Sequence, residues 1–137
     1  MPRSRGTPCA SLRLVLGLVA AHSAAIGLGL CLQPPAFFAL LGFAPVSEPF
    51  FPAQGGMMHL ILAAGYGLGA QDPVGRRALV VYAVFVKTAA ALFLFVYWLF
   101  VSRQWSVLAS GVVDGLMALV IAAAHARCRQ ASAAGRR

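Results

Sequence analysis

Two side chains of opposite charge lie in the middle of apolar segments that are long enough to cross a membrane. Lys87 lies within residues 78–101, and Asp114 lies within residues 105–124. A charge at the centre of a bilayer costs at least about 2.5–3.5 kcal/mol on insertion scales, so it is usually paired or functional. Such a pair can fix the register of two helices, or it can form the floor of a polar pocket or a proton-handling site. Alternatively, Lys87 extends along its apolar stem to a membrane surface.

Two histidines and a tyrosine add polar groups at a similar depth. With a rise of about 1.5 Å per residue, His22, His59, Lys87 and Asp114 all lie roughly 13–16 Å from the same side of the membrane. We therefore expect His59, Lys87 and Asp114 to form a mid-membrane pocket, with Tyr66 and His22 as further candidates. Each histidine is alternatively a helix-packing residue. The two histidines together are also candidate axial ligands of a haem.

No motif of hydrolytic or nucleotide-dependent chemistry is present in the sequence. It contains no P-loop, GxSxG elbow, HExxH or paired-carboxylate site. We therefore predict no catalytic residue and no metal site beyond the haem alternative. The three cysteines share no CxxC spacing and their number is odd, which argues against a disulfide framework and against a zinc site. These cysteines are Cys9, Cys31 and Cys128.

The composition indicates an integral membrane protein with a single domain. Of the 137 residues, 61% are hydrophobic and only 10% are charged, whereas roughly 25% of the residues of soluble domains are charged. The mean hydropathy of +0.83 agrees. The net charge of +8 alone would suit nucleic-acid binding, but the basic residues cluster at the chain ends and in one loop. No basic face alternates with aromatic residues, so we expect no nucleic-acid partner.

Four segments are predicted to span the membrane, at about 12–32, 53–70, 78–101 and 105–124. The first apolar run is about 20 residues long, which exceeds the roughly 7–15 residues of a signal-peptide core, so we expect it to be retained. These segments make up a membrane domain over residues 12–125. The basic tails at 1–11 and 126–137 are expected to be disordered.

Glycines and prolines predict local features between these segments. Residues 33–52 are rich in proline, and Pro34 and Pro35 can open a short interfacial helix over 36–43 with its phenylalanines in lipid. In the second segment, Gly65 and Gly69 form a GxxxG motif, a pattern that allows membrane helices to approach closely.

The basic residues predict the orientation of the spans. With the N-terminus in the cytoplasm, nine arginines lie on the cytoplasmic side and only Arg103 lies on the other side, which satisfies the positive-inside rule. The nine are Arg3, Arg5, Arg13, Arg76, Arg77, Arg127, Arg129, Arg136 and Arg137. We therefore expect an all-α, up-down-up-down four-helix bundle with both termini in the cytoplasm.

The chain resembles the small four-helix bacterial membrane proteins of the DoxX-like and BphX-like group. The resemblance rests on GGMMHLILAAGYGLGA in the second span, the turn QDPVGRR, the lysine of the third span and DGLMALV in the fourth, and it covers about residues 12–125. It implies a four-helix bundle in the bacterial inner membrane. Some members are associated with quinone-linked redox or aromatic-degradation gene sets. No catalytic residue carries over, and the lack of a CxxC argues against disulfide handling.

The sequence therefore favours a non-enzymatic membrane protein whose mid-membrane pocket binds a small amphipathic molecule, either a quinone or a lipid. One alternative is an accessory subunit of a larger respiratory or redox complex. Another is a small transporter that works as a homo-oligomer. An oxidoreductase with haem or quinone is a fourth possibility. All four share the lipid bilayer as their environment.

Overall fold

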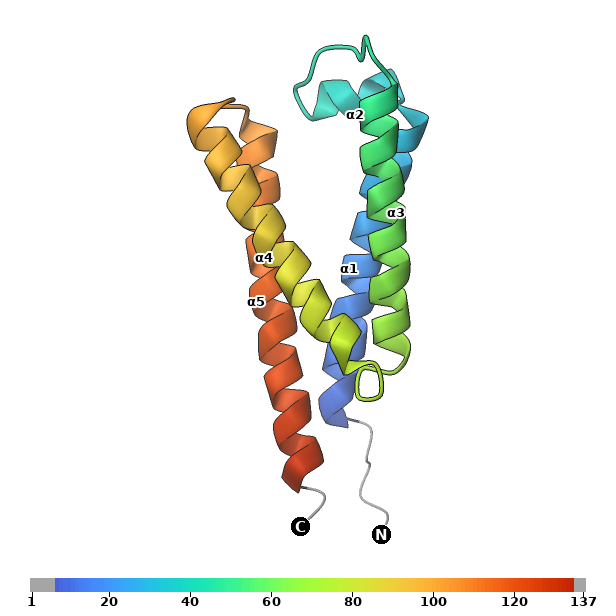
Figure 1. Ribbon diagram of the computed structural model, residues 1–137, viewed down its shortest axis with the longest axis vertical. Coiled ribbons are helices and arrows are strands. Elements are labelled where there is room, and N and C mark those ends of the chain that lie inside the picture. Colours follow the sequence, from blue (N-terminus) through green and yellow to red (C-terminus); the bar gives the residue numbers. More distant parts are fainter. Residues whose placement is uncertain (1–6, 135–137) are drawn as a thin grey trace.

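Residues 7–134 of the computed structural model form five α-helices, with no β-strand in that range (Figure 1). The helices are α1 (Thr7–Leu32), α2 (Pro35–Leu40), α3 (Phe50–Gln71), α4 (Arg77–Phe100) and α5 (Trp105–Ala134). The all-α prediction is confirmed. Helix α2 also confirms the predicted short helix after the double proline. Within the described residues, three helices are long and apolar enough to cross a membrane, namely α1 from Cys9 onward, α4 and α5.

Helix α3 is not among those three helices, although its 22 residues give it sufficient length. Its sequence contains five glycines together with Gln54, His59 and Tyr66, and these residues lower its hydropathy. Only a few of its side chains are fully buried, among them Tyr66 and Ala63. The composition of α3 thus fits a helix that turns small and polar residues toward other helices.

The prediction that residues 1–11 and 126–137 are disordered tails is partly wrong. Helix α1 already begins at Thr7, and α5 continues through residues 126–134 to Ala134, whereas residues 1–6 and 135–137 lie outside the described part. The extension of α5 is rich in alanine and also contains two arginines, and both residue types are good helix formers. Its Cys128 is buried against the start of α1, so tertiary packing supports the added turns.

A disulfide between Cys9 and Cys128 joins the start of α1 to the end of α5, with a Cα–Cα distance of 4.8 Å. This finding corrects the expectation that the cysteines are unpaired. The two residues are 119 positions apart, so sequence spacing carried no sign of their proximity. Only Cys31 remains a free thiol among the cysteines.

The helices pair into two hairpins that meet at one end of the molecule. Helix α1 packs mainly on α3, and α4 packs mainly on α5, while α1 and α5 form the largest contact between the hairpins. Figure 1 shows that the hairpins diverge toward the end that carries α2. Helix α1 begins and α5 ends at the opposite, closed end. The molecule is therefore open between the hairpins rather than a uniformly packed bundle.

Helices α1 and α3 approach each other closely at Gly27 and Gly56. A Cβ atom added to Gly56 would lie 2.7 Å from the Gly27 carbonyl oxygen and 2.9 Å from the Cys31 amide nitrogen. Only glycine permits such backbone contact. In contrast, a Cβ atom at Gly65 would meet nothing within 4 Å. The expectation that the GxxxG motif mediates this packing is therefore wrong at Gly65.

The residues that follow α2 connect the two hairpins at the open end of the molecule. The Gln104 side-chain amide, just before α5, donates hydrogen bonds to the carbonyl oxygens of Leu41 (3.2 Å) and Gly42 (2.7 Å). Gly42 has a positive φ of 77°, which glycine adopts without strain. Phe38 of α2 is buried, so this phenylalanine does not face lipid as predicted.

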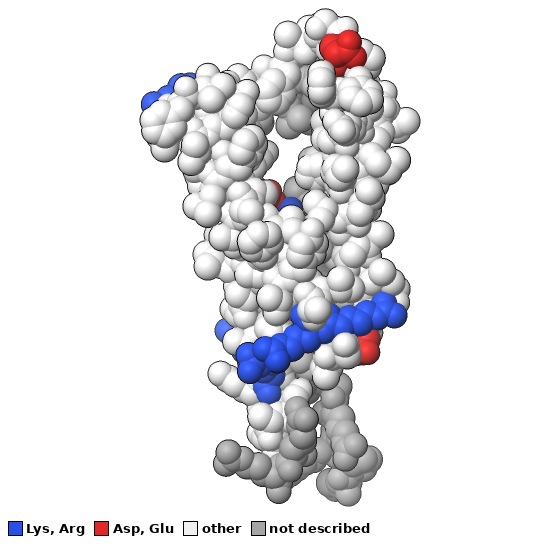
Figure 2. Space-filling view, in the orientation of Figure 1, with Lys and Arg blue, Asp and Glu red and all other residues white. Residues whose placement is uncertain are grey.

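The outer surface is dominated by large apolar side chains. Phe85, Leu92 and Leu119 are each more than 60% exposed, which is unusual for a protein surrounded by water. On the face shown in Figure 2, basic side chains form a band near the closed end, and the surface between that band and the open end is almost free of charge. Together with the three apolar helices, this surface indicates a multi-pass membrane protein.

We predict that Gly56→Ala destabilises the protein and that Gly65→Ala does not. The added methyl group at position 56 would collide with backbone atoms of α1, and overpacking of this kind costs about 1–3 kcal/mol. The methyl group at position 65 enters open space. Thermal unfolding in mild detergent measures the difference, and equal melting temperatures for the two variants would contradict the proposed contact.

Candidate functional site

The two membrane-embedded charges form an ion pair between α4 and α5. The Lys87 ammonium donates a hydrogen bond to Asp114 Oδ1 at 2.6 Å. Lys87 is 3% exposed and Asp114 is 8% exposed. Lys87 shares its helix face with the buried Ala83 and Ala91, whose small side chains leave room for α5 to approach. The structure therefore buries Lys87 and does not extend it to a membrane surface.

Tyr66 of α3 lies on the other side of Lys87. The ammonium nitrogen is 6.0 Å from the centroid of the Tyr66 ring, which is within the range of a cation–π interaction. Tyr66 is 2% exposed, and its hydroxyl has no hydrogen-bond partner in the described protein. The ion pair thus sits at the level where the α1–α3 hairpin meets the α4–α5 hairpin.

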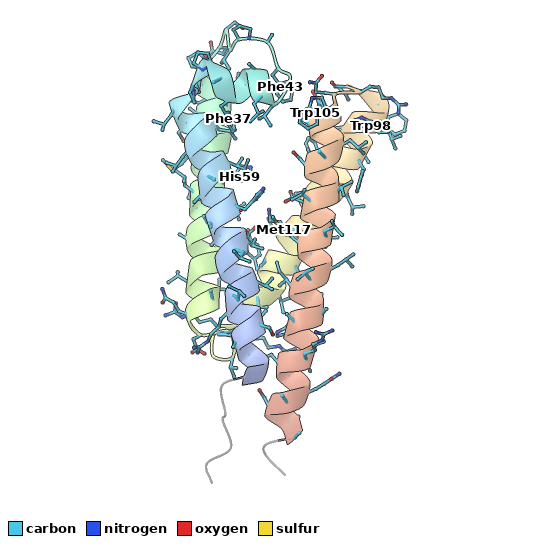
Figure 3. The ribbon with its side chains drawn as sticks, turned by 180° about the vertical axis from the view of Figure 1, so that it is seen from behind. Phe37, Phe43, His59, Trp98, Trp105 and Met117 are labelled. Carbon is cyan, nitrogen blue, oxygen red and sulfur yellow. A yellow bond between two sulfur atoms is a disulfide. The ribbon has the colours of Figure 1, made fainter. Side chains whose placement is uncertain are left out.

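A cavity of about 490 Å³ lies between the two hairpins and reaches Asp114. Leu41 and Trp105 line it together with residues of α1, α3, α4 and α5. Figure 2 shows the opening from one side, with one group of each charge visible at its lower end. In Figure 3, His59 reaches from α3 into the space between the hairpins, and Phe43 and Trp105 lie at its upper end. The cavity therefore has a polar floor under largely apolar walls.

Three residues that line the cavity each carry a buried polar atom without a hydrogen-bond partner in the described protein. These atoms are Nδ1 of His22, Nδ1 of His59 and Oγ of Ser106. The histidines belong to the α1–α3 hairpin and Ser106 belongs to the α4–α5 hairpin. A buried polar atom without a partner costs about 1–3 kcal/mol, so polar groups of this kind usually mark a bound molecule or water.

The structure brings three of the five predicted residues to the cavity. His22, His59 and Asp114 line it, whereas Lys87 and Tyr66 are buried beside it. Ser110 and Ser106, which lie four and eight residues before Asp114 on α5, also line the cavity, and the sequence analysis missed the contribution of Ser106. Their helical spacing was the available signal. Gln54 is exposed on α3 and does not line this cavity.

The two histidines do not fit a haem that is held from both sides. His22 and His59 lie on α1 and α3, whose backbones touch at Gly27 and Gly56, so no space for a macrocycle exists between these helices. Both residues line the same cavity. In the described residues, no group of three or more His, Cys, Asp or Glu side chains could hold a metal ion.

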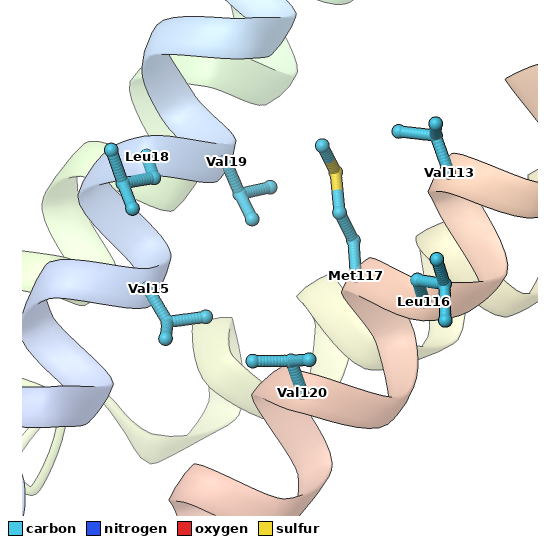
Figure 4. A pocket seen from close by; sticks show the side chains of 7 residues that line it. All are labelled: Val15, Leu18, Val19, Val113, Leu116, Met117 and Val120. Atoms are coloured by element: carbon cyan, nitrogen blue, oxygen red, sulfur yellow. The ribbon is translucent and has the colours of Figure 1, made fainter.

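An apolar groove adjoins the cavity between α1 and α5. It has a volume of about 280 Å³, and Val113 lines both the groove and the cavity. Figure 4 shows Val15 and Val19 of α1 pointing across toward Met117 and Val120 on α5, and Leu18 also lines the groove. The polar cavity thus continues into a purely aliphatic path on the lipid-facing surface.

Comparison with protein-family models, with characterised proteins and with solved structures gave no significant match. The sequence and the geometry of the chain together define a multi-pass membrane protein with a buried ion pair below a cavity between two helical hairpins.

Removing one member of the ion pair is expected to cost more than removing both. Lys87→Met leaves a buried carboxylate without its partner, and such a loss costs about 3–5 kcal/mol. The Lys87→Met, Asp114→Asn double variant carries no buried charge and should recover much of that stability. Unfolding measurements on the full cycle give the coupling energy. Strictly additive effects would contradict a direct interaction, and Thr88→Val, outside the pair, serves as the control.

Proposed function

We propose that this protein binds a neutral amphipathic molecule, a quinone or a lipid, in the cavity between its hairpins. The observation that carries the proposal is the set of partnerless polar atoms of His22, His59 and Ser106 above the Lys87–Asp114 pair. The positive charge of Lys87 and the negative charge of Asp114 compensate each other. The cavity therefore favours a head group that is polar but uncharged. Neutral imidazoles and hydroxyls can each donate a hydrogen bond, which suits a ligand with carbonyl oxygens on two edges.

The shape of the lining supports the same class of ligand. A head group between His59 and Ser106 would contact both hairpins at once. The adjoining groove at Val15, Leu18 and Met117 is aliphatic, and it suits an isoprenoid or acyl tail. An apolar pocket with a few convergent polar groups is the usual form of a small-molecule site.

The proposal includes a four-span arrangement in the bacterial inner membrane, with α3 as the fourth span and both ends in the cytoplasm. The resemblance to DoxX-like and BphX-like proteins and the nine-to-one distribution of arginines support it. The Cys9–Cys128 disulfide argues against this orientation. It joins the start of α1 to the end of α5, which the proposal puts in the cytoplasm, and the bacterial cytoplasm keeps thiols reduced. In this orientation the Cys9 and Cys128 thiols are reduced in the cell, and the distribution of arginines carries the assignment of the two ends to the cytoplasm.

Binding is tested by native mass spectrometry with a short-chain ubiquinone added to the protein in mild detergent. We expect a one-to-one adduct, and we expect His59→Phe and Ser106→Ala each to lower the affinity about tenfold. This change corresponds to about 1.4 kcal/mol, which is the loss of one hydrogen bond. Ser23→Ala is the matched control, because Ser23 is also buried without a partner but does not line the cavity. Equal affinity in all variants would refute the quinone site. If an endogenous lipid co-purifies and the same substitutions reduce the amount bound, the ligand is a lipid. If the chain is recovered only together with other subunits, an accessory role is favoured.

The orientation is tested by labelling with a membrane-impermeant maleimide in intact cells. In a variant whose native cysteines are serines, Ser47→Cys in the exposed connection before α3 should react, and Ala126→Cys on α5 should react only after lysis. Both positions are exposed in the structure. The reverse pattern would put the α5 end outside the cytoplasm, in the compartment where the disulfide is stable.

A further inference from the structure

A second pocket, separate from the central cavity, lies at the closed end of the molecule. It has a volume of about 350 Å³ and lies between the start of α4 and the last turns of α5. Arg77 and Arg129 line it, together with His125 and Ser132. Both guanidinium groups are within electrostatic reach of the His125 ring. The pocket therefore brings two exposed arginines together beside a half-buried histidine at the surface of the closed end.

The basic groups of this pocket are not neutralised by the protein. Within the described residues the single salt bridge is Lys87–Asp114, so neither Arg77 nor Arg129 pairs with a carboxylate. The neighbouring Asp72 accepts a hydrogen bond from the Gly75 amide through Oδ1. Both ring nitrogens of His125 are buried without a hydrogen-bond partner. An anion in the pocket would accept hydrogen bonds from both guanidinium groups and from the N–H of the His125 ring.

The amino end of α4 strengthens the attraction for an anion. Arg77 is the first residue of α4, and no side chain caps this end of the helix. Free amide groups and the helix dipole favour negative charge at such a position. Here the helix end adds to two arginines and a histidine that line the same pocket.

The depth of the pocket corresponds to the phosphate level of a bilayer. Arg77 precedes Lys87 by ten residues, a distance of about 15 Å along α4. A bilayer core is about 30 Å thick, so a mid-membrane Lys87 puts Arg77 at the boundary between acyl chains and head groups. His125 follows Asp114 by eleven residues on α5, which gives nearly the same depth.

An apolar groove leads from this pocket toward the membrane centre. Arg77 lines both the basic pocket and a groove along α4 whose other walls include Val81, Tyr82 and Phe85. The exposed rings of Tyr82 and Phe85 are stacked, with centroids 6.5 Å apart. A charged pocket joined to an apolar surface matches a molecule that has a phosphate head and a hydrocarbon tail.

We propose that the pocket formed by Arg77, His125 and Arg129 binds the phosphate of an anionic phospholipid, with an acyl chain along Val81, Tyr82 and Phe85. Basic pockets between membrane helices on the cytoplasmic side commonly bind anionic head groups. This site is independent of the central cavity, because the two share no lining residue.

The test is native mass spectrometry of the full chain, titrated with dioleoylphosphatidylglycerol or with dioleoylphosphatidylcholine. We expect tighter binding of phosphatidylglycerol, weakened about tenfold by Arg77→Gln or Arg129→Gln, the loss of about 1.4 kcal/mol. Arg129→Lys should retain most of the affinity, because lysine also binds phosphate as a point charge. The matched control is Arg127→Gln, which removes the same charge from an exposed position of α5 outside the pocket.

Two results would overturn the proposal. If Arg127→Gln weakens phosphatidylglycerol binding as much as Arg129→Gln does, the attraction is a general effect of basic charge and no specific site exists. If a 10-fold excess of inorganic phosphate displaces the lipid from the wild type, the pocket recognises a free anion and not a lipid. A tenfold ratio of affinities corresponds to a difference of about 1.4 kcal/mol in binding free energy. Melting temperatures of all variants, measured without added lipid, separate loss of binding from loss of folding.

Discussion

The buried ion pair between Lys87 and Asp114 is the constraint on which the arrangement of the helices depends. Each charge alone would be costly in an apolar layer, and the 2.6 Å contact satisfies both. The contact also fixes the register of α4 against α5, since a shift by one residue would separate the two groups. Tyr66 then brings the α1–α3 hairpin against Lys87, so the pair marks the level at which both hairpins converge.

Above this level the hairpins diverge, and the cavity follows from their divergence. Gly27 and Gly56 hold α1 and α3 together, while Gln104 ties the start of α5 to the end of α2. These two contacts limit how far the open end can spread. Below the ion pair, the arginines of α4 and α5 form no salt bridge in the described chain. The molecule thus has a neutral polar site at mid-depth and a basic site near one surface.

Much of the fold could be predicted from local patterns, because apolar length and charge position act within single helices. The ends of α3 and α4 lie within a few residues of the predicted spans. Contacts between distant segments were not predictable in this way. The Cys9–Cys128 disulfide, the Gly27–Gly56 approach and the position of Ser106 depend on how two helices meet. Ser110 lies one helical turn before Asp114, so its position beside Asp114 follows from helical spacing, whereas the place of Ser106 in the same cavity depends on the spread of the hairpins.

The most direct test of this account is a solid-state NMR distance between the Lys87 ammonium nitrogen and the Asp114 carboxyl carbon in lipid bilayers. Lys87 is the only lysine of the chain, so ¹⁵N-lysine labelling gives a single side-chain ammonium signal. With ¹³C-labelled aspartate in the Asp72→Asn variant, Asp114 is the single labelled aspartate. We predict strong dipolar coupling, consistent with the 2.6 Å nitrogen–oxygen contact. The absence of coupling in folded protein would contradict the ion pair and the helix arrangement that is built on it.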